Sequence, residues 1–177
     1  MTEQSEIERI RKKAEKYDEE ILRLISNRTK FPYYSRVYLN PDSNPDLTRD
    51  SCLLHYLNGF FAEVLSKVKL REQKKDTIPE HVFKLDREIA FKLMQRTTTI
   101  GYEVAKYKHP RGMPVYVKKV EERKIQTRIE QAKRDSLSLT DREIRDIFTS
   151  IFAETRRIEG INHDHSRSIE GIKSICN

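Results

Sequence analysis

Residues 79–108 read PEHVFKLDREIAFKLMQRTTTIGYEVAKYK, and the spacing of their apolar residues decides the fold class. The apolar positions that recur every four or seven residues are Leu85, Ile89, Leu93, Ile100 and Val104. Such spacing puts the side chains on one face of an α-helix. Pro79 suits the start of this helix, and the stretch His109-Pro110-Arg111-Gly112 is typical of a turn that ends it. The sequence therefore predicts a helix from about Pro79 to about Lys108.

The same periodicity predicts two helices before this one. The apolar stripe of the first helix consists of Ile7, Ile10, Ala14, Tyr17, Ile21 and Leu24. Pro32 and the cluster Asn40-Pro41-Asp42-Ser43-Asn44-Pro45 follow it and predict a loop. A second helix is expected from about Arg49 to Arg71, with its own apolar stripe.

Two more helices are expected after the turn at residues 109–112. One starts near Lys118 and carries Ile125, Ile129 and Ala132. The other begins with Thr140 as N-cap and Glu143 completing a capping box, and we expect a polar, loosely held tail after Gly160. The expected fold class is therefore all-α, a bundle of about five to six helices with no convincing strand.

Composition limits the class of protein. The chain has 177 residues, 36% of them charged, and a formal net charge of +7. That charge favours an anionic partner but does not choose between a polyanionic small molecule and nucleic acid. No apolar run is long enough to span a membrane, no secretory leader is visible, and Cys52 and Cys176 form neither a disulfide framework nor a metal motif. We expect a cytoplasmic enzyme or binding protein.

Polar residues that interrupt the apolar stripes are the main chemical signal. Arg96 and Lys108 continue the inner face of the helix predicted at residues 79–108, about 18 Å apart along its axis. Burying a charge is costly unless it is paired, so an inward charge needs a reason.

Inward polar residues are also expected on three other helices. They are Arg11 on the first helix, Glu122 before Ile125, and Thr155 and Glu159 on the face of Phe148 and Phe152. Each residue alone is more often a stripe edge or a structural ion pair. Together the two arginines, one lysine, two glutamates and one threonine suit a pocket for a small anion.

Four stretches resemble a known family, the all-helical chorismate mutases. They are IRKKAEKYDEEILRLISNR, with Arg11, Asp18 and Arg28; EVAKYKHPRGMPV, with a lysine before a Gly-x-Pro turn; VEERKIQTRI; and IRDIFTSIFAETRRIE. Their order covers most of residues 7–160, and Thr and Glu at positions 155 and 159 resemble the eukaryotic branch. The resemblance implies an isomerase that converts chorismate to prephenate in aromatic amino-acid biosynthesis.

The resemblance also implies roles for the inward residues. Arg11 and Arg96 would bind the substrate carboxylates, with support from Thr155. Lys108 and Glu159 would meet the ether oxygen from opposite sides. Glu122 would hold the ring hydroxyl, with the neighbouring Glu121 as a close competitor.

An internal repeat accompanies this resemblance. Asp18 and Arg28 are ten residues apart, and so are Asp86 and Arg96. The second copy has Pro79 where the first has Arg11, and the first has Leu39 where a lysine is expected. We therefore expect one chorismate mutase-like domain over residues 1–177, made of two degenerate halves at 1–75 and 79–160 with a polar tail at 161–177. Such a chain resembles eukaryotic enzymes in which one chain mimics a dimer.

One position departs from the family pattern. The family has an arginine eleven residues before its lysine, where this chain has Thr97, and Arg96 lies twelve residues before Lys108. Either the helix carries one extra residue or this carboxylate contact is altered, with Arg28 as a substitute donor.

The expected partner is a small dianion, chorismate, with neither nucleic acid nor a membrane, and a homodimer is compatible with the sequence. No cofactor or metal is expected, and His163-Asp164-His165 in a polar tail is assigned none. The alternatives are a basic, non-catalytic helical protein that binds nucleic acid or a protein partner, and a mutase relative that has lost activity.

Overall fold

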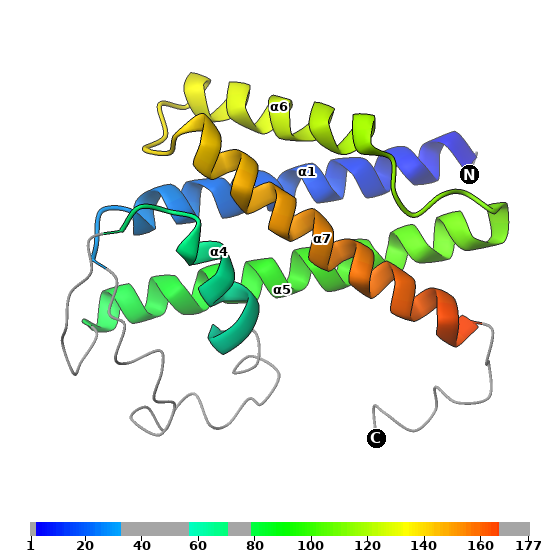
Figure 1. Ribbon diagram of the computed structural model, residues 1–177, viewed down its shortest axis with the longest axis horizontal. Helices are drawn as coiled ribbons and strands as arrows, with labels where there is room; N and C mark the ends of the chain where they lie inside the picture. Colours follow the sequence, from blue (N-terminus) through cyan, green and yellow to red (C-terminus); the bar gives the residue numbers. More distant parts are fainter. Residues whose placement is uncertain (1–2, 33–56, 71–78, 167–177) are drawn as a thin grey trace.

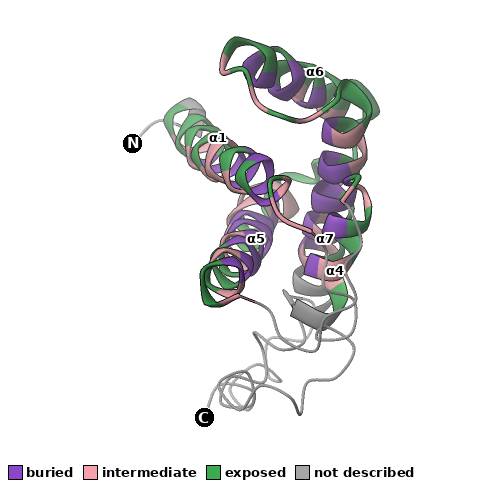
Figure 2. Cartoon of the chain, turned by 90° about the vertical axis from the view of Figure 1, so that its left-hand side faces the viewer, coloured by how far each residue is buried: buried purple, intermediate pink, exposed green. Residues whose placement is uncertain are grey.

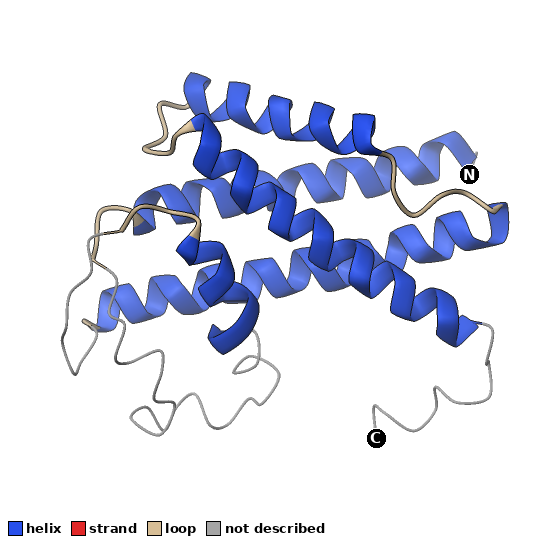
Figure 3. Ribbon diagram, viewed as in Figure 1, coloured by secondary structure: helices blue, strands red, loops and turns tan. Residues whose placement is uncertain are grey.

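The computed structural model describes residues 3–32, 57–70 and 79–166, and within them the chain forms helices and no strand (Figures 1 and 3). The α-helices are α1 (Glu3–Arg28), α4 (Ala62–Ser66), α5 (Glu80–Lys108), α6 (Lys118–Arg134) and α7 (Asp141–Ser166). A π-helical turn (Leu57–Phe61) leads into α4, and a 3-10 turn (His109–Arg111) follows α5. The expected all-α helical fold is confirmed.

The long helices α1 and α5 lie side by side in opposite directions, and α7 packs across α5 with α6 next to it (Figures 1 and 2). Their apolar stripes face inward and form one main core from α1, α4, α5, α6 and α7. A smaller cluster of Ile10, Ala14 and Ile100 joins α1 to α5 farther along. No helix in the described ranges is long and apolar enough to cross a membrane.

Two buried ion pairs join α1 to α5. Arg96 Nε donates to Asp18 at 2.9 Å, and Arg28 Nε donates to Asp86 at 2.5 Å. All four residues are at most 2% exposed. The arginine of each ten-residue spacing therefore binds the aspartate of the other, which is the pattern expected of two related helices packed antiparallel.

Burial also affects the aspartate of the second pair. Loss of solvent raises the pKa of Asp86 to about 6, although the charge of Arg28 and its hydrogen bond act to lower it. Arg28 makes two more hydrogen bonds, to the carbonyl oxygens of Phe31 and Pro32 at 3.0 Å each. Arg28 therefore donates hydrogen bonds to three different residues of the fold.

The predicted helix boundaries agree with the structure in α5, α6 and at the start of α7. Pro79 is the N-cap of α5. The capping box before α7 is present: Glu143 N–H donates to Thr140 Oγ1 at 3.2 Å, and Thr140 N–H donates to Glu143 Oε2 at 2.8 Å. Periodicity and capping chemistry were sufficient to place these elements.

Two boundaries differ from the prediction. The helix expected to reach Arg71 ends at Ser66, because the chain turns toward α7 and Lys69 N–H donates to Glu143 Oε1 at 2.9 Å. Its expected beginning at residues 49–56 lies outside the described residues, as do Cys52, Cys176 and Leu39. The tail after Gly160 was expected to be loose, but α7 continues to Ser166, since a polar sequence without proline does not stop a helix.

Gly101 sets the separation between α5 and α7. A Cβ atom at this position would lie 2.9 Å from Ile158 Cγ2 and 3.1 Å from the carbonyl oxygen of Thr155. The two helices can approach this closely only because the side chain is missing. Since Thr155 is one of the two contacted residues, this close packing also determines the position of Thr155 relative to α5.

We expect Gly101→Ala to lower the free energy of unfolding by about 1–3 kcal/mol, because the added methyl group must push α7 away. Gly160→Ala is the matched control, since a Cβ there meets nothing within 4 Å and alanine favours the helix by up to about 1 kcal/mol. Urea unfolding of both variants measures the effect. Equal stabilisation by the two alanines would contradict the close packing.

Candidate active site

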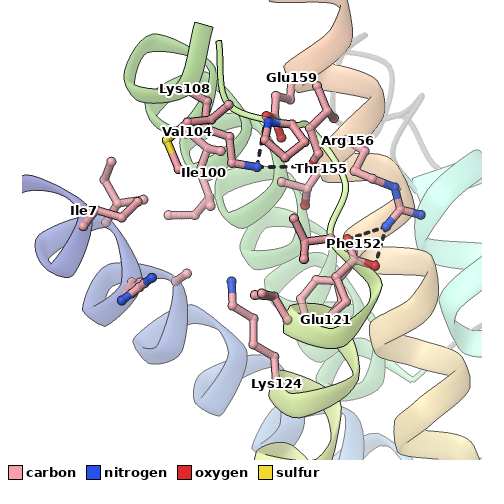
Figure 4. A pocket seen from close by; sticks show the side chains of 18 of the residues that line it. Ile7, Ile100, Val104, Lys108, Glu121, Lys124, Phe152, Thr155, Arg156 and Glu159 are labelled. Carbon is pink, nitrogen blue, oxygen red and sulfur yellow. Dashed lines mark hydrogen bonds and ion pairs between the residues drawn. The ribbon is translucent and has the colours of Figure 1, made fainter. Parts of the chain in front are cut away.

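A cavity of about 210 Å³ lies between α1, α5, α6 and α7, beside the segment 113–117 that joins α5 to α6 (Figure 4). Apolar side chains such as Ile10, Ile100 and Phe152 form much of its wall. The ionisable side chains that line it are Arg11, Arg96, Lys108, Glu121, Lys124, Arg156 and Glu159. The cavity has room for one small molecule, and its lining carries more positive than negative groups.

Five of the six predicted site residues line this cavity: Arg11, Arg96, Lys108, Thr155 and Glu159. They come from α1, α5 and α7, and the closest two on the chain are four residues apart. The fold thus brings together side chains that the sequence placed on separate helices.

Lys108 and Glu159 face each other at one end of the cavity. Lys108 Nζ lies 3.3 Å from Glu159 Oε1 and donates to the carbonyl oxygen of Val115 at 3.0 Å. The chain reverses direction at Gly112, whose φ of 60° is left-handed, and this turn brings the Val115 carbonyl next to Lys108. The Gly-x-Pro turn therefore positions the ammonium group.

Glu159 is 2% exposed, and its Oε1 makes no hydrogen bond with a described residue. Burial raises the pKa of Glu159 above its ordinary value, and nearby Glu121 acts in the same direction. Lys108 and Arg156 oppose this rise. The group is therefore easier to protonate than an ordinary glutamate, and a protonated carboxyl can donate a hydrogen bond.

Arg96 is held rigidly at the wall of the cavity. Besides its bond to Asp18, its Nη1 donates to Thr155 Oγ1, and its guanidinium lies 5.2 Å from the ring centre of Phe152. Thr155 in turn donates to the carbonyl oxygen of Ile151 at 2.7 Å. Arg96 therefore reaches the cavity in one fixed orientation.

Arg11 stands at the rim of the cavity. Its side chain is 57% exposed, and among the described residues it forms an ion pair with Glu8, one turn earlier on α1, at 3.7 Å. Exposed pairs of this kind contribute about 0–1 kcal/mol. The guanidinium can therefore exchange Glu8 for an anion in the cavity at little cost.

The inward placement of Glu122 is wrong. Glu122 is exposed and does not line the cavity, whereas Glu121 does, and both Glu121 oxygens accept hydrogen bonds from Arg156 Nη1. Glu121 lies on the same line of α6 as the buried residues Ile125 and Arg128, and Glu122 lies to the outer side of that line. Glu121, which the sequence offered as the alternative to Glu122, is the residue that faces the cavity.

Arg28 does not replace the arginine missing at Thr97. Its side chain is fully buried against Asp86 and does not line the cavity. Thr97 is also buried, and its hydroxyl donates to the carbonyl oxygen of Leu93 at 2.8 Å. Of the neighbouring residues Arg96 and Thr97, only Arg96 lines the cavity.

Sequence reasoning missed two cavity residues, Lys124 and Arg156. Lys124 lies three residues after Glu121 and four before Arg128, so the signal was the polar spacing 121, 124 and 128 on one face of α6. That signal was obscured because Lys124 directly precedes the apolar Ile125. As for a metal, the described residues hold no group of three side chains that could bind one.

Residues 78–160 match the family model of chorismate mutase type II. This part of the chain is similar to the chorismate mutases of type II. The match spans α5, α6 and most of α7 and covers a little less than half of the chain. No curated protein and no solved structure matches the chain. The matched residues therefore supply most of the cavity wall, while Arg11 comes from α1, outside them.

We expect Glu121→Ala to lower kcat/KM for chorismate by about ten- to hundredfold, the range for losing a hydrogen bond to a charged group. Glu122→Ala is the matched control on the same helix turn and should stay within about twofold of the parent. Steady-state kinetics on both variants measures this difference. A larger loss in Glu122→Ala than in Glu121→Ala would contradict the placement of these two side chains.

Proposed function

We propose that this chain converts chorismate to prephenate in the cavity between α1, α5, α6 and α7, as a single-chain enzyme of the pseudo-dimeric, eukaryotic type. The observation that carries the proposal is the Lys108–Glu159 pair, which faces a cavity also lined by Arg11 and Arg96. The chorismate mutase match over residues 78–160 supports the same reaction. The natural setting is aromatic amino-acid biosynthesis in the cytoplasm.

The reaction is an intramolecular rearrangement in which a carbon–oxygen ether bond breaks while a carbon–carbon bond forms. The enzyme has to hold the dianion in a bent conformation and stabilise the charge that grows on the ether oxygen. Arg11 and Arg96 suit the first task, because a guanidinium binds a carboxylate through two parallel hydrogen bonds. Thr155 supports this contact by orienting Arg96, and Glu121 is placed to accept a hydrogen bond from the ring hydroxyl.

Lys108 and Glu159 suit the second task. The ammonium group is held by the Val115 carbonyl and points at the same space as Glu159. A charged Glu159 would repel the ether oxygen, but a protonated Glu159 would donate a hydrogen bond to it. The raised pKa of Glu159 favours the protonated form.

The reciprocal ion pairs support the pseudo-dimeric form. Asp18–Arg96 and Asp86–Arg28 join equivalent positions of α1 and α5 in opposite directions, as an approximate twofold axis between the helices requires. Arg11 on α1 reaches the cavity of the second half, and its counterpart on the other side is Pro79. We therefore infer two degenerate halves, residues 1–75 and 79–160, that together build one complete site.

The direct test is the loss of chorismate absorbance with purified wild-type protein and with Lys108→Ala. Removing one charged donor from the transition state should lower kcat by about 10²–10³-fold. Lys106→Ala is the matched control, because Lys106 lies on the same turn of α5 but is exposed and outside the cavity. A folded wild-type protein without saturable turnover would favour an inactive relative or a binding protein instead.

A second test uses pH. We expect wild-type kcat to fall as pH rises through the raised pKa of Glu159, because the carboxyl loses the proton that it donates. Glu159→Gln keeps a donor at every pH, so this fall should disappear. Rate–pH profiles of the two proteins measure the effect, and the same fall in both would show that another group titrates.

A further inference from the structure

Lys124 differs from the other cations that line the cavity. Arg11, Arg96, Lys108 and Arg156 each form an ion pair, with Glu8, Asp18, Glu159 and Glu121 respectively. Lys124 has neither an ion pair nor a hydrogen bond to any residue in the described ranges. Its side chain extends from α6 into the cavity, and Nζ lies 6.0 Å from the ring centre of Phe152 (Figure 4).

The surroundings of Lys124 are unfavourable for a positive charge. Burial lowers the pKa of Lys124, and the charges of Arg96, Lys108 and Arg11 lower it further, while Asp18 on α1 opposes them. The remaining charged groups of the lining are Glu121 on the same helix and Arg156 and Glu159 on α7. Glu121 and Arg156 form an ion pair with each other, so the carboxylate of Glu121 does not neutralise Lys124.

An unpaired ammonium among four other cations is stabilised when an anion enters the same cavity. The substrate proposed above carries two carboxylates. Arg96 lies 5.2 Å and Lys124 lies 6.0 Å from the ring centre of Phe152, both side chains line the same cavity, and the charge of Arg96 acts on Lys124. A carboxylate placed there would meet both cations at once.

We propose that Lys124 binds one carboxylate of the dianionic substrate beside Arg96, and so supplies the cation that the chain lacks at Thr97. This inference rests on the proposed function and adds a residue to its site. Because the product keeps both carboxylates, Lys124 contributes to binding of substrate and product more than to the chemical step. Its removal should therefore change KM more than kcat.

The experiment compares Lys124→Met, which keeps the length of the side chain without its charge, with Lys124→Arg and Lys119→Met. Lys119 is exposed on the same helix and does not line the cavity, so its variant is the matched control. We expect Lys124→Met to raise KM for chorismate by about ten- to hundredfold with a smaller change in kcat. Its affinity for prephenate, measured by calorimetry, should fall by a similar factor, while Lys119→Met matches wild type.

The pH dependence gives a readout that a structural role would not move. In the wild type, KM should rise with pH as Lys124 loses its proton at a lowered pKa. Lys124→Arg should keep a low KM over the same range, because a guanidinium stays charged. If Lys124→Met does not fold, the pH dependence of KM in the wild type and in Lys124→Arg still tests the role of Lys124.

The outcomes separate this inference from the proposed function. Wild-type turnover with KM and prephenate affinity within twofold in Lys124→Met would overturn the role of Lys124 alone. Loss of prephenate binding in Lys124→Met, with no turnover in wild type, would overturn the proposed function and keep the anion site. A wild-type protein that neither turns over chorismate nor binds prephenate would overturn both.

Discussion

The buried charges between α1 and α5 are the constraint on which the rest of the structure depends. Four charged side chains lie almost wholly out of solvent, and each is tolerated only because its partner stands opposite. Sliding one helix by a turn would separate both pairs, so they hold α1 and α5 in a single register. That register sets Arg11 beside the second half of α5, where Arg96 and Lys108 reach the cavity. Packing of α7 against Gly101 then adds Thr155 and Glu159.

Much of the fold could be predicted from the sequence, because long apolar stripes and caps are local signals. Arg96, Thr155 and Glu159 were also placed correctly, since each continues the spacing of an apolar stripe on its own helix. Glu122 was placed wrongly because the apolar stripe of α6 begins only at Ile125. Two adjacent glutamates just before a stripe are nearly equivalent in periodicity, and the partner that distinguishes them, Arg156, comes from another helix.

The remaining errors concern side chains whose role depends on a distant partner. Arg28 was considered as a carboxylate donor because periodicity cannot reveal that Asp86 already occupies it. Lys124 escaped notice because its lack of a partner is a property of the assembled cavity. For the same reason the sequence could predict that charges point inward, but not which of them remain available to a ligand.

The surplus of positive charge in the cavity bears on how a catalytic cycle would end. Cations that bind carboxylates would bind chorismate and prephenate about equally, since the rearrangement leaves both carboxylates in place. Such binding raises occupancy without lowering the barrier, so under the proposed function Lys108 and Glu159 would be the groups that stabilise the transition state. The same binding would slow the dissociation of prephenate, so product release would compete with the chemical step as the slowest step. Under the proposed function, the half-exposed Arg11 at the rim would be the contact that can open first to release the product.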